Sequence, residues 1–272
     1  MLQILVNGDQ DKALKCHEKA LKIRLDKLES NHIHVAYSYN NLGTVYEKKG
    51  EYDKAIEYYE KSLKIRLDKL GSDHIDVASS YKNMGIIYSR IGEYDRAIEY
   101  HEKSLKIFLD KLGSDHINVA TSYNNLGNIY QNNGEYDKAI EYNKKALKIR
   151  LDKLGSDHID VAISYGNMGS VYWRIGEYDR AIEYYEKSLK IRLDKVGSDH
   201  IDVALSYINL GNVYFSKGEY NKTIEYYEKS LKIYLDKLGS DHIDKGEYDK
   251  AIEYHKKALK IRLDKLGSNH EN

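Results

Sequence analysis

Residues 36–78 read AYSYNNLGTVYEKKGEYDKAIEYYEKSLKIRLDKLGSDHIDVA, with apolar and small residues recurring every three or four positions. This spacing is typical of amphipathic helices that bury one stripe of side chains. Gly50 separates two such runs, and Gly71 follows the second, where a helix C-cap favours glycine. The stretch therefore predicts a hairpin of two helices, which we name the first-type and second-type helices. Their apolar positions are Ala36, Tyr39, Leu42, Gly43 and Tyr46, then Tyr52, Ala55, Ile56, Tyr59, Leu63, Leu67 and Leu70.

The hairpin recurs along the chain with a fixed period. GSDHID begins at residues 71, 155, 197 and 239, GSDHIN at 113 and the related ESNHIH at 29, in steps of 42 or its multiples. Such self-similarity is typical of a stacked repeat array rather than of one or two globular domains. We expect one all-α solenoid over residues 1–272. Full repeats are expected at about 36–69, 78–111, 120–153, 162–195 and 204–237, with orphan helices at 8–28 and 247–266.

The carboxy-terminal copy lacks a first-type helix. GSDHIDKGEYDK at 239–250 passes from one linker straight into the next second-type helix and skips 14 residues. We expect the helix at 247–266 to fold back into the vacant place. Its stripe of Ala251, Ile252, His255 and Leu259 would then pack on the fifth repeat.

The linker places a serine, an aspartate and a histidine side by side, as in Ser72, Asp73 and His74. Adjacent side chains diverge, so they cannot form a nucleophile–base–orienter chain, which is assembled from distant segments. A metal site needs three or four converging ligands, and one histidine per repeat does not supply them. The linker is therefore interpreted as structural, with Ser72 and Asp73 as candidate helix N-caps.

Composition narrows the functional classes. The chain carries 43 basic and 43 acidic residues, so no electrostatic footprint for nucleic acid or anionic membrane is present. The single cysteine, Cys16, fits a reducing compartment, and no apolar run is long enough to span a bilayer. The start MLQILVNGDQDK lacks the basic region of a signal peptide. We expect a cytoplasmic protein without metal or cofactor.

The hairpin resembles the tetratricopeptide repeat, whose signature spaces an aromatic residue, Leu-Gly, tyrosine, a small residue and an aromatic residue. In the first full copy these residues are Tyr39, Leu42, Gly43, Tyr46, Ala55 and Tyr59. The resemblance implies a right-handed superhelix of antiparallel helix pairs, with first-type helices lining the concave face. Leu67 stands where the family usually has a proline, so the second-type helix can run on and lengthen the period. Long repeats of this kind resemble those of kinesin light chains and related scaffold proteins.

One asparagine recurs two residues before each mid-helix glycine. In relatives of this type the equivalent asparagines grip the backbone of an extended peptide, and an amide offers both acceptor and donors for that task. The alternative is that they form hydrogen bonds between neighbouring helices, and the two roles are compatible. The candidate residues are Asn41, Asn83, Asn125, Asn167 and Asn209.

Other positions on the first-type helices vary between copies. The last two repeats place apolar residues there, which predicts a patch for an apolar or aromatic anchor of the ligand; drift or packing between adjacent helices is the alternative. Basic residues at neighbouring positions favour an acidic ligand. The apolar set is Ile163, Trp173, Leu205, Ile208 and Phe215, and the basic set is Lys82, Arg90 and Arg174.

These patterns favour a non-catalytic scaffold that binds an extended peptide or protein segment in its concave groove. The sequence contains no nucleophile–base pair, no paired carboxylates in an apolar pocket and no metal-ligand spacing, so we do not expect an enzyme. A kinesin light chain-like cargo adaptor is one alternative. The regulatory repeat arm of a larger enzyme or signalling protein is another.

Overall fold

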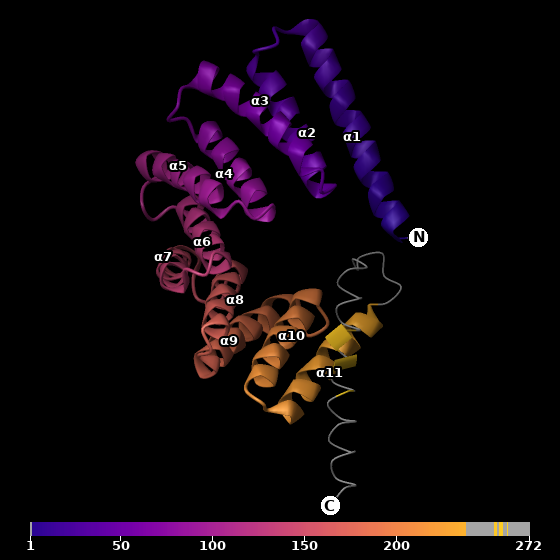
Figure 1. The fold of residues 1–272 in the computed structure, drawn as a ribbon, viewed down its shortest axis with the longest axis vertical. Helices are drawn as coiled ribbons and strands as arrows, with labels where there is room; N and C mark the ends of the chain where they lie inside the picture. Colours follow the sequence, from indigo (N-terminus) through magenta and orange to yellow (C-terminus); the bar gives the residue numbers. More distant parts are fainter. Residues whose placement is uncertain (1, 238–252, 255, 258–259, 261–272) are drawn as a thin grey trace, which may run out of the picture. The chain divides into compact units, whose positions relative to one another are not determined.

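A computed structural model describes residues 2–237 together with 253, 254, 256, 257 and 260, and over these residues the chain is helical with no strand (Figure 1). The chain divides into two compact units, residues 1–149 and 150–272, and the boundary between them falls within α7. The helices are α1 Leu2–Lys27, α2 Ile33–Lys48, α3 Tyr52–Leu70, α4 Ile75–Arg90, α5 Tyr94–Leu112, α6 Ile117–Asn132, α7 Tyr136–Leu154, α8 Ile159–Arg174, α9 Tyr178–Val196, α10 Ile201–Ser216 and α11 Tyr220–Asp236.

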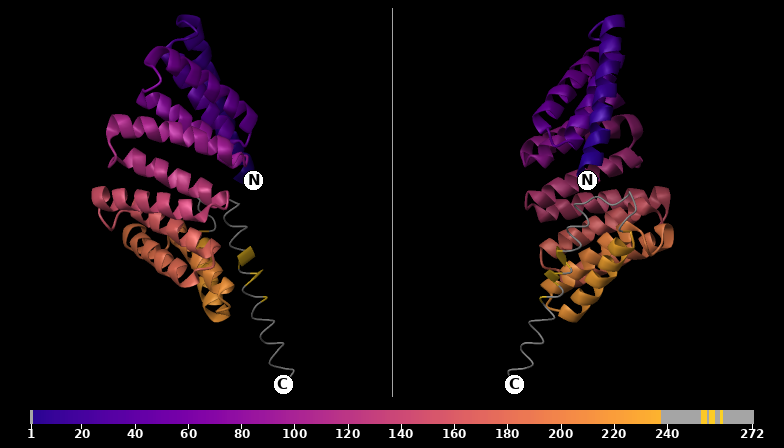
Figure 2. Two further views of the ribbon diagram at one scale, coloured as in Figure 1. Left: turned by 60° about the vertical axis from the view of Figure 1, so that its left-hand side comes forward. Right: turned by 90° about the vertical axis from the view of Figure 1, so that its right-hand side faces the viewer.

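Consecutive helices pack as hairpins. In the amino-terminal unit α2 lies against α3 and α4 against α5, and in the carboxy-terminal unit α8 lies against α9 and α10 against α11 (Figure 2). Each hairpin contains a stacked tyrosine pair, such as Tyr46 with Tyr58 at 5.3 Å between ring centroids. The equivalent pair Tyr130 and Tyr142 joins α6 to α7. The predicted all-α fold of helical hairpins is confirmed, whereas the handedness of a superhelix stays a prediction.

The close approach of the two helices depends on the mid-helix glycine. A Cβ atom on Gly43 would lie 2.6 Å from Cδ1 of Tyr59, so only glycine lets the ring cross the first-type helix at this depth. Val35 and Ala36 of the same helix are fully buried, as are their counterparts in every later copy. The repeated positions therefore form the core.

Arginines on most second-type helices bond to the first-type helix that follows. Arg66 in α3 donates from Nη1 to the Asp76 carbonyl at 3.1 Å and to Ser80 Oγ at 2.7 Å, both in α4. Arg24, Arg150 and Arg192 make the same pair of bonds to the helices that follow them. In the second repeat the position holds a buried phenylalanine, Phe108.

The linker histidines, rather than the neighbouring serine and aspartate, cap the first-type helices. His74 Nδ1 accepts a hydrogen bond from the Asp76 backbone N–H at 3.0 Å. The prediction that Ser72 or Asp73 caps α4 is therefore wrong, because the helix begins at Ile75, one residue beyond His74. Asp73 instead accepts a hydrogen bond from Lys111 of the next hairpin. The equivalent caps are His32, His116, His158 and His200.

The amino-terminal helix is longer than predicted, and the structure does not test the predicted carboxy-terminal helix. α1 begins at Leu2, six residues before the predicted start of the orphan helix, and packs against α2. The predicted fold-back helix 247–266 lies largely outside the described residues, as do Ala251, Ile252, His255 and Leu259. Among the described residues, the Tyr254 ring lies 5.0 Å from the Tyr227 ring of α11.

Candidate peptide-binding surface

The recurring asparagines reach solvent from the first-type helices. Asn41 on α2 is exposed, and its four counterparts on α4, α6, α8 and α10 are half-buried. Asn83 Nδ2 donates to Asn40 Oδ1 of the preceding repeat at 3.0 Å. The alternative role, a bond between neighbouring helices, therefore holds for Asn83, whose amide oxygen is not used in that bond.

Side chains of successive first-type helices are linked at a spacing of one period plus one residue. Besides the pair of asparagines, Glu47 accepts from Arg90 Nε at 3.2 Å, and Trp173 Nε1 donates to Ser216 Oγ at 2.9 Å. Glu47 thus neutralises part of the charge that Arg90 would offer an acidic ligand. Arg174 places its guanidinium 5.5 Å from the Trp173 ring centroid, so part of this predicted anchor surface is already covered.

The predicted apolar patch is divided between surface and core. Phe215 is 47% exposed and Ile163 39%, whereas Trp173 and Leu205 are half-buried. Ile208 is only 5% exposed and packs in a cluster with Val203, Ala204, Ile233 and Tyr234. The sequence pattern did not separate these positions, because Ile208 follows Leu205 by three residues and shares its helix face.

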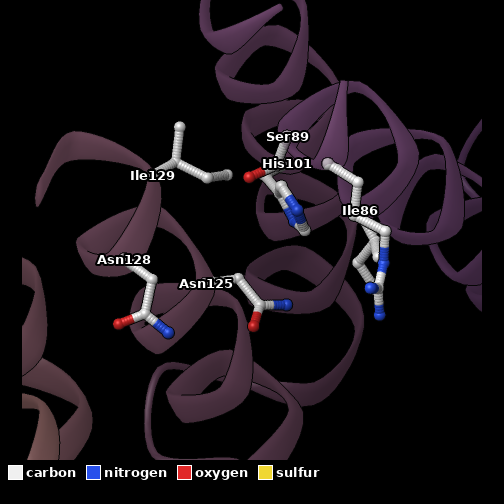
Figure 3. Close-up of a pocket in the computed structure, with 7 residues that line it drawn as sticks. Ile86, Ser89, His101, Asn125, Asn128 and Ile129 are labelled. Atoms are coloured by element: carbon white, nitrogen blue, oxygen red, sulfur yellow. The ribbon is translucent and has the colours of Figure 1, made fainter. Parts of the chain in front are cut away.

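A hollow of about 210 Å³ opens between α4, α5 and α6 of the amino-terminal unit (Figure 3). Its lining includes two predicted residues, Arg90 and Asn125. Five further residues line it that the sequence reasoning missed: Ile86, Ser89, His101, Asn128 and Ile129.

His101 at this hollow is 1% exposed, and its Nδ1 atom has no hydrogen-bond partner. Burial lowers the pKa of His101 to about 4, with the positive charge of Lys82 acting in the same direction. The imidazole is therefore neutral at pH 7. A signal for this site existed in the sequence, since the copies place Tyr59, Tyr185 and Tyr227 where the second repeat has His101.

Across the described part of the chain, no group of three or more histidine, cysteine, aspartate or glutamate side chains could hold a metal ion. The described helices also include none that is long and apolar enough to cross a membrane.

The sequence profile described as Tetratricopeptide repeat matches residues 4–68, 35–110, 76–152, 118–194 and 160–236, and a second profile of the same description matches residues 235–272. The chain belongs to the tetratricopeptide repeat family. No curated protein sequence matches this tetratricopeptide repeat chain.

Solved structures share the tetratricopeptide repeat fold. BtubC (BKLC) from P. vanneervenii is 24% identical with a TM-score of 0.71, covering 86% of this chain and 94% of its own. A Podosopora anserina structure, named for the nearly identical TPR-like repeats of a kinesin light chain, is 24% identical with a TM-score of 0.64 over 75% of this chain and 97% of its own. The APC/C hetero-tetramer Cut9-Hcn1 matches at 19% identity and a TM-score of 0.62, over 94% of this chain and 41% of its own. At these identities the likeness shows the fold alone.

Proposed function

We propose that the chain is a non-catalytic scaffold that binds an extended protein segment along the exposed surface of its first-type helices. The proposal rests on one observation, which is that the repeat copies differ mainly at solvent-facing positions. Most of their buried positions repeat, as in the fully buried valines that match Val35, whereas solvent-facing positions change, from Tyr37 to Ile163 and from Glu47 to Phe215. A surface that varies over a fixed framework is suited to recognising one partner.

The chemistry of this surface suits a peptide backbone with side-chain anchors. Half-buried asparagine amides offer donors and acceptors to N–H and C=O groups. Phe215 and Ile163 offer apolar area, which aromatic and aliphatic anchors of a partner would bury. Proteins of this family generally mediate protein–protein interactions. Acidic residues of the ligand would be favoured near the basic side chains of Lys82, Arg90 and Arg174. We also expect the protein to act in the cytoplasm.

The test is selection of ligands on a peptide array, followed by calorimetry on variants. Trp173→Ala should weaken the selected ligands by about 2 kcal/mol or more, roughly 30-fold in Kd, if its ring is a buried anchor. Phe215→Ala should weaken them in the same direction. The double variant Asn125→Ala with Asn167→Ala should weaken all ligands, since it removes backbone contacts rather than one anchor.

Leu235→Ala is the matched control, because Leu235 on α11 has the same 47% exposure as Phe215 but lies on a second-type helix. Equal losses for Phe215→Ala and Leu235→Ala would contradict the proposal, as would unchanged binding by both Trp173→Ala and Phe215→Ala. A thermal melt of each variant separates lost binding from lost folding. If the asparagine double variant melts well below wild type, these side chains are chiefly structural.

A further inference from the structure

One position on the second-type helix connects the core to the surface of the first-type helix. In the first repeat Tyr59 crosses Gly43, and its hydroxyl reaches Glu47 Oε2 at 2.8 Å and Thr44 Oγ1 at 3.2 Å. In the fifth repeat the hydroxyl of Tyr227 donates to Asn212 Oδ1 at 2.7 Å. A phenol from the core thus fills the space beside the first-type helix in these copies.

The second repeat lacks that phenol. His101 crosses Gly85 in the same way, and a Cβ atom on Gly85 would lie 2.5 Å from its Cδ2 atom. The imidazole is shorter than a tyrosine side chain, and the counterparts of Thr44 and Glu47 are Ile86 and Ser89. These three residues line the hollow of about 210 Å³ (Figure 3). The hollow therefore lies where a tyrosine hydroxyl lies in other repeats.

The lining suits an aromatic ring that carries a hydroxyl. Ile86 and Ile129 provide apolar walls, and the neutral imidazole of His101 lies between them in Figure 3. Asn128 of the third repeat also lines the hollow, and its side-chain amide offers a hydrogen-bond acceptor and two donors to a polar group there. Aromatic side chains with a polar tip prefer sites that are apolar on one side and polar on the other.

An arginine at the edge of the hollow has a counterpart in a later repeat that contacts an aromatic ring. Arg90 at the edge of the hollow corresponds to Arg174 two repeats later, and Arg174 lies over the Trp173 ring at 5.5 Å from its centroid. A guanidinium in this place can therefore cover an aromatic face, an attraction that arises from the ring quadrupole. Ser89 and Asn125 complete the polar side of the rim.

We propose that this hollow is a subsite for a tyrosine side chain of the bound protein segment, so that the ligand supplies the phenol that the second repeat has lost. The inference rests on the proposed function, because it names one side chain of the segment. The ring would lie between the two isoleucines and above His101. Its hydroxyl would bond to the Asn128 amide, with Arg90 over the exposed face.

The direct test uses small probes and nuclear magnetic resonance, and does not require a known partner. N-acetyl-tyrosine methylamide should produce saturable shifts at the His101 ring and at the side-chain amides of Asn125 and Asn128. The phenylalanine analogue should bind about fivefold to tenfold more weakly, as expected for one lost hydrogen bond in a site built to receive it. The glutamate analogue should not produce the same shifts.

Two variants block the hollow with residues that other copies already carry. His101→Tyr introduces the tyrosine of three other repeats, and Ser89→Trp introduces the residue that the fourth repeat has as Trp173. Both should abolish the shifts at Asn125 and Asn128 while retaining the helical melt. Tyr185→His, which changes the same position in the fourth repeat, is the control and should leave the shifts unchanged.

Peptides complete the test. Tyrosine-containing peptides selected on the array should lose at least about tenfold in affinity for His101→Tyr and on replacement of their tyrosine by alanine, but other peptides should not. Absence of saturable shifts with the tyrosine probe, equal shifts in the blocked variants, or preference for the glutamate probe would each overturn the inference. Peptide binding that persists in those cases would leave the proposed function standing. Conversely, probe binding without any peptide ligand would overturn the proposed function and the assignment of the site to a protein segment, and would leave the hollow as a site for a free phenol.

Discussion

One buried position differs between the copies at the residue scale, and it is occupied by Tyr59, His101, Asn143, Tyr185 and Tyr227. The tyrosines bury their rings and, in Tyr59 and Tyr227, bond through their hydroxyls to the first-type helix. Asn143 is fully buried, and neither its Oδ1 nor its Nδ2 atom has a hydrogen-bond partner. Burying polar atoms without partners costs free energy, so the third repeat is weakened at this position.

Asn143→Tyr should therefore stabilise the protein by about 1–3 kcal/mol, because it removes two unsatisfied buried atoms and fills their place with an aromatic ring. The new hydroxyl would face Asn128, as that of Tyr227 faces Asn212. Urea unfolding measures the change. Asn143→Ala also removes the unsatisfied amide, but it provides no ring and no hydroxyl, so it should stabilise less than tyrosine does. A tyrosine variant less stable than wild type would mean that the third repeat has no room for the ring.

His101 should make stability depend on pH. Its pKa falls from the ordinary 6.5 to about 4 on folding, so between these values the unfolded chain binds a proton that the folded chain does not. Acidification through this window then favours unfolding, and the stability that is present above pH 6.5 is lost as the pH falls towards 4. The loss should be at most about 3 kcal/mol, since one pKa unit is worth about 1.4 kcal/mol. His101→Tyr should show a smaller difference in unfolding free energy between pH 7 and pH 4.5 than wild type, and equal differences would contradict the assignment.

At the scale of the helical element, neighbouring residues of one linker have different structural roles that depend on their position. His74 caps α4 through Nδ1, whereas Asp73 bonds to Lys111 of the next hairpin. Only the histidine stands immediately before the first helical residue, where a side chain can reach the backbone N–H two residues on.

His74→Ala should cost about 1 kcal/mol of unfolding free energy, the usual loss when a capping side chain is removed. Ser72→Ala is the control, because the cap at this helix is His74, and it should change stability by less than about 0.5 kcal/mol, as is normal for surface sites. Urea unfolding of both variants checks the difference. A larger loss for Ser72→Ala than for His74→Ala would contradict the observed cap.

Arg66→Ala should cost about 2 kcal/mol, because it removes the bonds to the Asp76 carbonyl and Ser80 Oγ and leaves a gap between α3 and α4. Arg66→Phe should cost less, since the second repeat buries Phe108 at this position and its facing Ser122 bonds to the Asn118 carbonyl instead. Ser80 already makes the equivalent bond to Asp76. Thermal unfolding compares the two variants, and equal losses would mean that the charge, rather than the filled volume, holds the hairpins together.

At the scale of the whole molecule, the contacts between hairpins repeat with the sequence period. A nearest-neighbour array of this kind derives its stability from individual repeats and the interfaces between them. Removing one whole period should therefore rejoin matching surfaces, whereas removing part of one should not.

Deletion of residues 75–116 places Ile117 after His74 and brings Arg66 opposite Ser122 in place of Ser80. We expect cooperative unfolding with an m-value about 15% smaller, because m scales with the surface exposed and 42 of 272 residues are removed. Helical content per residue, measured by circular dichroism, should be unchanged. Deletion of residues 75–92 removes α4 alone, and it should lose much of its helicity or aggregate. Equal behaviour of the two deletions would contradict a repeat array.

The sequence by itself determined the hairpin, its period and the buried stripe, because helical periodicity and glycine punctuation act over distances shorter than one repeat. It also identified asparagines that reach the surface of the first-type helices. Only the tertiary structure decided that His74 rather than Ser72 is the cap, that Ile208 belongs to the core while Phe215 is exposed, and that Asn83 bonds to Asn40 of the preceding repeat. The hollow at His101 is also a product of the tertiary structure, because residues of α4, α5 and α6 line it together. The cap depends on where the helix begins, whereas the other features depend on how neighbouring helices pack against one another, and no pattern within a single helix encodes that packing.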